Sequence, residues 1–270
     1  MVKRPNLQYA NFRRKLLRFY KQHGRDLPWR KTTDPYRVTV AELMLQQTQV
    51  ERVVPKYEAW IKKWPSWRAL AKADNRELLT IWSGLGYNRR ALFLGKMAKA
   101  IVHEYDGEMP RDLKELEKLP GIGRYTARAI LIFAYNEPLV TIDTNIRRVL
   151  LSEFGLPDNT PVAKIEELAE QLLPKRRSRD WHNALMDYSR LMLPKRLPGI
   201  RSGNRQTTFE GSLRQIRGEI VRQLTERKSV AVHTIAAKLR RTEGDVIAAA
   251  EALAKDGVIE LKRRRMFLKD

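Results

Sequence analysis

The sequence predicts a mainly α-helical protein that ends in a small domain of helices and a hairpin. Apolar residues recur at helical spacing from residue 8 to residue 193. A stretch rich in proline, glycine and arginine, 194–211, then interrupts the pattern. Three short helical patterns and two alternating strands follow, and the strands are joined by Arg263-Arg264-Arg265.

The helical segments begin with an amphipathic helix over 8–22, where apolar and basic residues alternate at helical spacing. Asp34 followed by Pro35 is typical of a helix start, because aspartate caps a helix N-terminus and proline suits the first turn. A helix should therefore run from about Tyr36 to Val50. Further helices are expected over Tyr57–Lys63, Trp67–Ala73, Asn75–Ser83, Leu92–Tyr105, Leu113–Lys118, Ile130–Tyr135, Ile146–Phe154, Val162–Leu173 and Trp181–Leu193.

The C-terminal part has a pattern of its own. Helices are expected over Leu213–Leu224, Val232–Leu239 and Asp245–Lys255, and strands over Val258–Lys262 and Met266–Leu268. Three helices and a basic hairpin form a winged-helix pattern. Such domains bind DNA or dock to other proteins, and the basic turn favours DNA.

The charge balance indicates a polyanionic partner. The 270 residues include 53 Lys and Arg against 31 Asp and Glu, a net charge of +22, and the cations are spread over both halves. The alternative is a soluble, cation-rich protein without such a partner. No signal peptide or membrane-spanning pattern is present, so we expect an intracellular protein. The chain has no cysteine, which excludes disulfides, thiolate nucleophiles and cysteine-held metal sites.

A tight turn precedes one of the apolar helices. Gly121 and Gly123 flank one apolar residue, and such a turn directs backbone N–H groups and a positive helix end at whatever lies in front. An ordinary helix-to-helix connection would use the same residues. Lys118, Arg124 and Arg128 surround the turn and favour a phosphate.

Five motifs occur in one order along the chain. They are Asp26-Leu27-Pro28-Trp29-Arg30, the stretch from Asp34 to Val50, Gly84-Leu85-Gly86-Tyr87, Leu119-Pro120-Gly121-Ile122-Gly123 and Asn183-Ala184-Leu185-Met186-Asp187. Over roughly residues 8–193 the chain resembles the helix-hairpin-helix DNA glycosylases, and more narrowly the MutY-type adenine glycosylases. The resemblance implies a two-lobed helical core over 1–193. A basic linker over 194–211 and a winged-helix-like domain over 212–270 would follow.

The resemblance also implies roles in breaking an N-glycosidic bond. Glu42 would protonate the departing base, and Asp143 would stabilise the positive charge on the sugar. Taken singly, either carboxylate could instead form a surface salt bridge. Tyr125 stands where related enzymes that also nick the strand carry a lysine, which implies a monofunctional enzyme. Asn145 matches a residue that helps to hold the site.

Other positions would contact the base and the DNA. Arg30 and Asp187 match residues of the adenine pocket. The positions expected to touch DNA, either in the vacated base stack or at the backbone, are Gln46, Gln47, Tyr87, Lys118, Gly121, Gly123, Arg124 and Thr126.

Two departures from the family affect the expected cofactor and substrate. Family members usually carry a four-cysteine iron–sulfur loop, which this chain cannot form, so we expect no cofactor and no metal. The Nudix-like C-terminal domain that reads 8-oxoguanine opposite the adenine is also missing, which leaves the opposite base open.

Three functions remain in competition. The first is removal of adenine mispaired with 8-oxoguanine or guanine, by a monomer acting on double-stranded DNA. The second is removal of thymine or uracil opposite guanine. Tyr125 and Thr144 allow it, whereas the Gln46-Gln47-Thr48 run and Asp187 favour adenine. The third is a non-catalytic DNA-binding regulator, against which the two carboxylates Glu42 and Asp143 argue.

Overall fold

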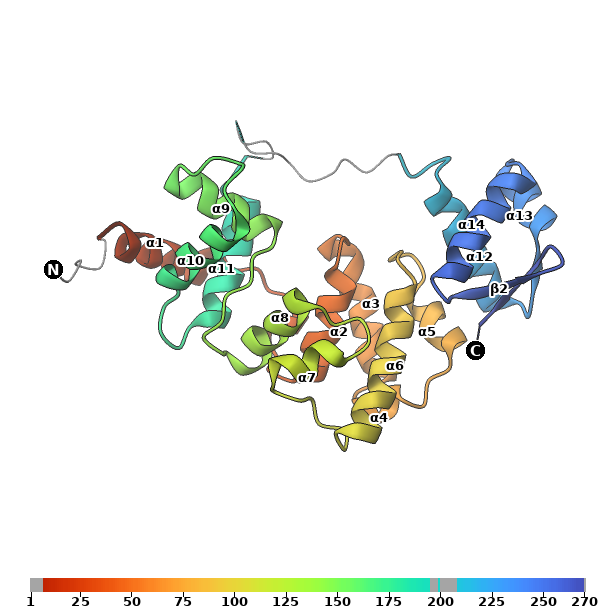
Figure 1. Ribbon diagram of the computed structural model, residues 1–270, viewed down its shortest axis with the longest axis horizontal. Helices are drawn as coiled ribbons and strands as arrows, with labels where there is room; N and C mark the ends of the chain where they lie inside the picture. Colours follow the sequence, from red (N-terminus) through yellow and green to blue (C-terminus); the bar gives the residue numbers. More distant parts are fainter. Residues whose placement is uncertain (1–6, 195–198, 200–207, 270) are drawn as a thin grey trace. The chain divides into compact units, whose positions relative to one another are not determined.

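The structure is a computed structural model, and it describes residues 7–194, 199 and 208–269 (Figure 1). The mainly helical fold class is confirmed. Contacts divide the chain into two compact units, one of residues 1–38 and 123–205 and one of residues 39–122 and 206–270. Among the described helices, none combines the length and the apolarity that crossing a membrane requires.

The first unit is built from helices that come from two separate stretches of the chain, 1–38 and 123–205. They are α1 (Leu7–His23), the 3₁₀ turn η1 (Pro28–Arg30), the first turn of α2 (Pro35–Leu45), α8 (Arg124–Tyr135), α9 (Thr144–Phe154), α10 (Val162–Leu172) and α11 (Ser178–Leu191). Helix α1 packs along α11, and α11 packs in turn against α9. The N-terminal helix is thereby fixed to a segment about 170 residues later in the chain.

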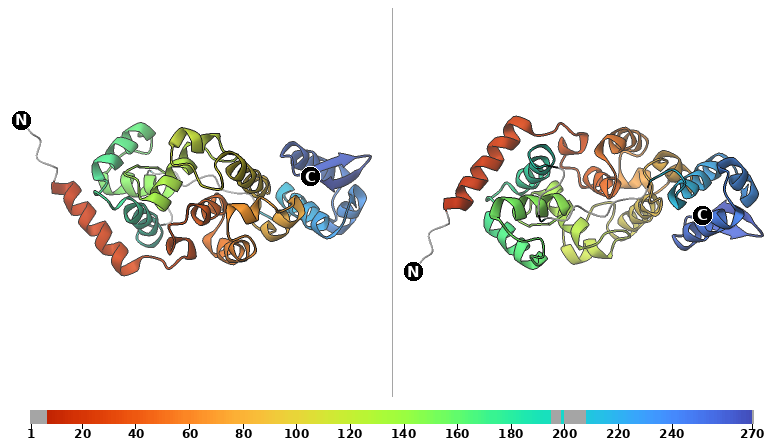
Figure 2. Two further views of the ribbon diagram at one scale, coloured as in Figure 1. Left: turned by 90° about the horizontal axis from the view of Figure 1, so that it is seen from below. Right: turned by 90° about the horizontal axis from the view of Figure 1, so that it is seen from above.

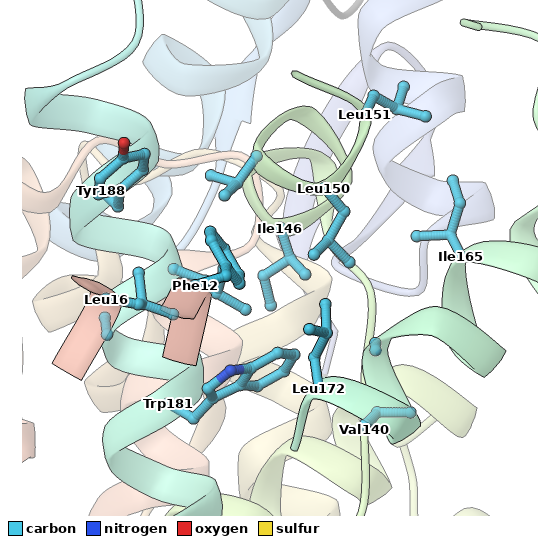
Figure 3. Close-up of a cluster of buried hydrophobic side chains, with 14 of the residues drawn as sticks. Phe12, Leu16, Val140, Ile146, Leu150, Leu151, Ile165, Leu172, Trp181 and Tyr188 are labelled. Atoms are coloured by element: carbon cyan, nitrogen blue, oxygen red, sulfur yellow. The ribbon is translucent and has the colours of Figure 1, made fainter. Parts of the chain in front are cut away.

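The core of the first unit lies where α1, α9, α10 and α11 meet. Phe12, Leu16 and Phe19 form the apolar stripe of α1, and Trp181 of α11 is fully buried against this cluster (Figure 3). Each large apolar side chain buried in this way contributes on the order of 1.5–3 kcal/mol. The predicted amphipathic helix over 8–22 is confirmed, and this core holds the start of α9 in place.

A smaller apolar cluster attaches α8 to the start of α2. Val38 packs with Ala129, Ile132 and Phe133, and Tyr125 lies against the same cluster. Most of α8 is buried, which agrees with its nearly continuous apolar sequence. The cluster therefore fixes the first turn of α8, where the glycine turn ends.

The second unit contains a lobe of helices and the C-terminal module. The lobe consists of the remainder of α2 with α3 (Val50–Lys63), α4 (Trp67–Leu70), α5 (Asn75–Trp82), α6 (Arg89–Glu104) and α7 (Leu113–Lys118). The rings of Trp60 and Trp82 meet edge to face at 5.7 Å, and both are fully buried. Helix α7 has the predicted bounds, and Asp112 caps it by accepting hydrogen bonds from Lys114 N and Glu115 N.

Helix α2 begins as predicted but ends early. The carboxylate of Asp34 accepts a 2.9 Å hydrogen bond from the backbone N–H of Tyr36, as expected for a cap. The prediction that the helix continues to Val50 is wrong, because it stops at Leu45 and Gln47 adopts a left-handed φ of 53°. Gln46 and Gln47 therefore lie in the turn that follows the helix.

The C-terminal module has the element order of a winged helix. It runs through α12 (Leu213–Glu226), β1 (Val230–Ala231), α13 (Val232–Leu239), α14 (Glu243–Lys255), β2 (Ile259–Lys262) and β3 (Arg265–Leu268). The sheet is antiparallel in the order β1-β3-β2. The strand β1 was not predicted, because two residues carry no alternation pattern and their pairing with β3 is not local in sequence.

The module packs on the lobe through α12 and α5, which lie side by side in Figure 2. The guanidinium of Arg76 on α5 donates to the backbone oxygens of Leu224, Thr225 and Arg227 at the end of α12. These are carbonyls that a helix C-terminus leaves without an intrahelical partner, and a cation suits the negative end of the helix dipole. Of the expected linker over 194–211, residues 195–198 and 200–207 lie outside the described residues.

Candidate active site

Asp143 is the N-cap of α9. One carboxylate oxygen accepts a 2.7 Å hydrogen bond from the backbone N–H of Ile146, and the other accepts a 2.9 Å bond from the side-chain amide of Asn145. Burial raises the pKa of the Asp143 carboxyl, and these hydrogen bonds oppose that rise by favouring the charged form. The result is an oriented carboxylate at the positive end of a helix.

Asn145 in turn is held by a residue that the sequence did not single out. The hydroxyl of Ser189 on α11 is 3.5 Å from Oδ1 of Asn145, and the guanidinium of Arg148 approaches the same hydroxyl at 3.5 Å. Ser189 is almost completely buried. A serine inside a helix gives no sequence signal of this kind, since its position depends on the packing of α11 against α9.

The segment that leads to Asp143 is positioned by three side chains from α8 and α11. Ser178 donates to the carbonyl of Leu139, and Arg128 donates to that of Val140. Nε2 of His182 accepts the N–H of Thr141 at 3.3 Å, because Nδ1–H is directed at the carbonyl of Ser178. Burial lowers the pKa of His182 to about 4, so the ring is neutral at physiological pH.

Asp187 lies at the centre of a buried ion-pair cluster. Its two oxygens accept hydrogen bonds from Arg30 at 2.6 and 3.0 Å, from Nε of Arg25 at 2.5 Å and from the backbone N–H of Arg25 at 2.9 Å. Burial alone would raise the pKa of Asp187, but the bonds and charge of Arg30 and Arg25 outweigh it and lower the pKa.

This geometry joins Arg30 and Asp187 to each other, and the predicted contact of Arg30 with a base stays a prediction. Four donors occupy the carboxylate, so Asp187 fixes the loop before η1 to α11. Arg25, the other partner, was not among the predicted residues. A contact from Asp187 to a base remains a prediction.

The two glycines of the glycine turn differ in backbone conformation and in the space around them. Gly121 has a φ of +81°, and a Cβ there would come within 2.8 Å of Phe93. Gly123 is extended, with a φ of −108°, and a Cβ would meet open space. Gly121 therefore builds the turn, whereas Gly123 leaves the start of α8 open to close approach.

The side chains around this turn differ in exposure. Lys118 and Arg124 are exposed and form ion pairs with Glu115 at 2.6 Å and with Glu166 at 3.4 Å. Thr126 is only 4% exposed, so in this conformation its side chain packs inside the first turn of α8. Tyr125, beside it, is half-buried.

In the second unit, two turns meet through Gln47 and Tyr87. Tyr87 is 47% exposed, and its hydroxyl donates a 2.6 Å hydrogen bond to the side-chain oxygen of Gln47. Both residues have left-handed backbones, with φ of 53° and 49°. Non-glycine residues adopt this conformation at a cost of about 1–3 kcal/mol, and such strain gathers at functional sites.

The buried guanidinium of Arg90 holds both turns. It donates to the carbonyls of Leu43 at 2.6 Å and Gln46 at 2.7 Å in one turn, and to that of Gly86 at 3.0 Å in the other. The bonds to Leu43 and Met44 satisfy two of the last carbonyls of α2, and the bond to Gln46 holds the turn that follows the helix. Burial lowers the pKa of Arg90 to about 10, which leaves it charged at neutral pH.

The predicted site residues thus form two sets. Asp143, Asn145, Tyr125, Arg30 and Asp187 belong to the first unit, and Glu42, Gln46, Gln47 and Tyr87 belong to the second. Glu42 is half-buried on α2. In the part of the chain that the structure describes, no three His, Asp or Glu side chains gather in a way that could hold a metal ion.

Comparison with known proteins gives the family. Residues 40–175 match the HhH-GPD superfamily base excision DNA repair protein family. The chain is also 37% identical over 227 residues to a protein of Mycolicibacterium smegmatis named adenine DNA glycosylase, which covers 76% of this chain and 78% of that protein. The chain belongs to the HhH-GPD superfamily.

Two further proteins that are similar to this chain have different substrates in their names. The human protein named adenine DNA glycosylase is 40% identical over 189 residues, which cover 65% of this chain and 35% of the human protein. A solved structure described as a thermostable thymine-DNA glycosylase is 31% identical, with a TM-score of 0.63, and the match covers 69% of this chain and 88% of that one.

The match to the HhH-GPD family includes the turns of Gln47 and Tyr87, the glycine turn at Gly121 and Asp143. Arg30 and Asp187 lie outside the matched residues. The iron–sulfur cluster usual in this superfamily does not fit this chain, which has no cysteine to hold it. No step of the chemistry is therefore assigned to such a group.

Proposed function

We propose that this chain is a DNA glycosylase that excises adenine mispaired with 8-oxoguanine or guanine. The observation that carries the proposal is the carboxylate of Asp143, oriented by Asn145 and Ile146 at the start of α9. The names of the mycobacterial and human relatives support adenine as the base. The net charge of +22 suits a DNA duplex.

The proposed chemistry uses two carboxyl groups in different states. Glu42 donates a proton to the adenine ring as the bond from C1′ of the sugar to the base breaks, and the bond electrons leave with the base. Asp143, ionised, stabilises the positive charge that develops on the sugar until water adds at C1′. General acid catalysis of this kind contributes about 10²- to 10⁴-fold in rate.

The enzyme is proposed to be monofunctional, because Tyr125 offers a phenol and not an amine. Tyr125→Lys places an amine at the start of α8, and we expect it to gain some strand cleavage through a Schiff base. Borohydride trapping of the protein on DNA measures that gain. Tyr125→Phe is the control and should trap nothing.

The proposal includes a division of the chain into two domains and a connecting segment. A glycosylase core over 1–193 is followed by a basic segment over 194–211 that takes the place of the iron–sulfur loop and works without a cluster. The winged-helix-like domain over 212–270 stands where adenine glycosylases of this type carry their Nudix-like domain.

The second candidate function is excision of thymine or uracil opposite guanine. The similarity to the thymine-DNA glycosylase structure favours it. Thr144 and Tyr125 are compatible with it too. The chemistry of Glu42 and Asp143 would be the same, and the base pocket would differ.

The test is single-turnover base release from labelled duplexes. Four duplexes carry A opposite 8-oxoguanine, A opposite G, T opposite G and U opposite G, and alkali then reveals abasic sites. Release of adenine is expected. Release of thymine or uracil alone would assign the pocket to pyrimidines and contradict the adenine proposal.

A variant pair tests the role of the carboxylate. Asp143→Asn keeps a capping side chain but loses the charge, so base release should fall at least 10²-fold while duplex affinity stays equal or rises. Asp112→Asn, at the N-cap of α7, is the matched control and should keep full activity. Equal activity of Asp143→Asn and the wild type would remove the proposed mechanism.

A further inference from the structure

The turn between β2 and β3 is strained at two arginines. Lys262 pairs with Arg265, so only Arg263 and Arg264 form the loop, and their φ values are 45° and 60°. Two positive φ values characterise a type I′ hairpin turn, in which Asn-Gly is strongly favoured. Two arginines in these positions make the hairpin less stable, which indicates that the cations themselves are needed.

This turn belongs to a larger group of exposed cations. Lys262, Arg263, Arg264 and Arg265 are all exposed. Arg264 forms a 3.0 Å ion pair with Glu243, the first residue of α14. The hairpin turn is therefore next to the turn between α13 and α14.

The turn between α13 and α14 adds two more exposed cations, Arg240 and Arg241. Arg240 ends α13 in a left-handed conformation with a φ of 51°, a third arginine in a position that favours glycine or asparagine. We name these cations the wing surface, which consists of Lys262, Arg263, Arg264, Arg265, Arg240 and Arg241.

Helix α14, which would read bases in a helix-turn-helix protein, is poorly suited to that task. Its exposed positions are Gly244, Ala248, Glu251 and Lys255. Base edges are read mainly by arginine, lysine, asparagine and glutamine, and of these types this fully described helix carries only Lys255, in its last turn. Acidic residues also occupy its first turn, where helix-turn-helix proteins contact the groove.

We infer that the wing surface binds the phosphate backbone of duplex DNA without reading its sequence. Its exposed guanidinium groups match the charge and geometry of phosphate oxygens. The module packs on the lobe through Arg76, so this contact lies at a fixed place relative to α5. The inference rests on the proposed function in that DNA is the ligand, and it holds whichever base is excised.

The test exploits the strain in the turn. Arg263→Asn combined with Arg264→Gly installs the favoured type I′ pair, so we expect Tm to rise by about 2–4 °C. Affinity of the full chain for an undamaged duplex should nevertheless fall about tenfold near 0.1 M salt. The slope of log K against log salt should become shallower by about 1.8, since two phosphate contacts are lost.

Three matched variants identify the cause. Lys175→Asn with Arg176→Gly removes the same charge at another left-handed arginine, whose φ is 58°, and should leave affinity within twofold. Arg263→Lys with Arg264→Lys should retain most of the affinity. Glu243→Gln releases Arg264 from its ion pair and should strengthen binding.

The outcomes separate this inference from the proposed function. Unchanged affinity and salt slope in the Asn-Gly variant would overturn the inference and point to a protein partner, whatever base is released. An equal loss of affinity in the variant of Lys175 and Arg176 would also overturn it. If the chain does not release adenine, its affinity for the undamaged duplex still tests whether the wing surface binds DNA.

Discussion

The hydroxyl of Tyr87 donates a 2.6 Å hydrogen bond to the side-chain oxygen of Gln47, 40 residues earlier in the chain. Both residues have left-handed backbones, and both turns depend on the guanidinium of Arg90. A base that leaves the helix must be replaced in the stack. The two side chains are thus held together before any DNA is bound.

Arg90→Lys should disrupt this arrangement. A lysine cannot donate to both turns at once, because it lacks the planar fork of arginine. We expect a loss of about 2–4 kcal/mol in the free energy of unfolding. On the prediction that Gln47 and Tyr87 fill the vacated stack, single-turnover base release should fall more for a paired target base than for one placed opposite an abasic site.

The neighbouring Arg89 provides the control for that experiment. Its side chain is 56% exposed, and its ion pair with Asp256 is long, at 3.8 Å. Arg89→Lys should therefore leave stability and base release close to those of the wild type. An equal effect of both substitutions would contradict the role of Arg90 in positioning the turns.

Asp187→Asn should lower the free energy of unfolding by about 3–5 kcal/mol, because it removes the buried counter-charge of the partly buried Arg25 and Arg30. Chemical denaturation measures this loss. Asp26→Asn, which breaks the exposed pair with Lys31, should change stability by less than about 1 kcal/mol. A stable Asp187→Asn variant that fails only on adenine would instead support the role of Asp187 in the base pocket.

His182 should make stability depend on pH. Its pKa is lowered from 6.5 to about 4, so the folded protein favours the neutral ring. This contribution is complete above pH 6.5 and is lost as the pH falls towards 4, where the unfolded chain binds the proton first; the full change is about 3 kcal/mol. Denaturant midpoints measured between pH 7.5 and 4 report it.

His182→Gln should lower stability at neutral pH and flatten this part of the pH profile. His233→Gln, at an exposed position of α13, is the control and should keep the wild-type profile. A His182→Gln profile as steep as that of the wild type would assign the acid sensitivity to other groups.

The two glycines of the hairpin should respond differently to alanine. Gly121→Ala combines a φ of +81° with a contact of 2.8 Å to Phe93, so unfolding should become easier by about 1–3 kcal/mol. Gly123→Ala should cost less than about 1 kcal/mol. If a phosphate approaches the start of α8, Gly123→Ala should weaken duplex binding more than it weakens the fold. Thermal unfolding of the two alanine variants measures the effect on stability, and a binding titration measures the effect on DNA affinity.

Local signals predicted the fold well. Asp34, Asp112 and Asp143 each cap a helix at or near the predicted start, because capping depends on residues two or three positions apart. Helix α7 has the predicted bounds for the same reason.

The failures of prediction involve contacts between distant residues. Helix α2 stops early because Arg90, more than 40 residues later, takes the carbonyls of Leu43 and Met44 near its end and that of Gln46 in the following turn. Arg25 and Ser189 were not predicted as site residues, because their contacts with Asp187 and Asn145 form only when α11 packs beside other elements. Periodicity and capping patterns contain no information about such partners.

The cap that Arg76 provides for α12 has a consequence for how this architecture can change. Because the module is placed by its docking on α5, the length of the 194–211 stretch does not set its position. Insertions and deletions in that stretch should be neutral for the lobe, whereas substitutions at the contacts between α5 and the module, Arg76 first among them, should weaken the docking. A different C-terminal domain could replace this one only if it fitted the surface of α5, whereas the length of the 194–211 stretch would matter less.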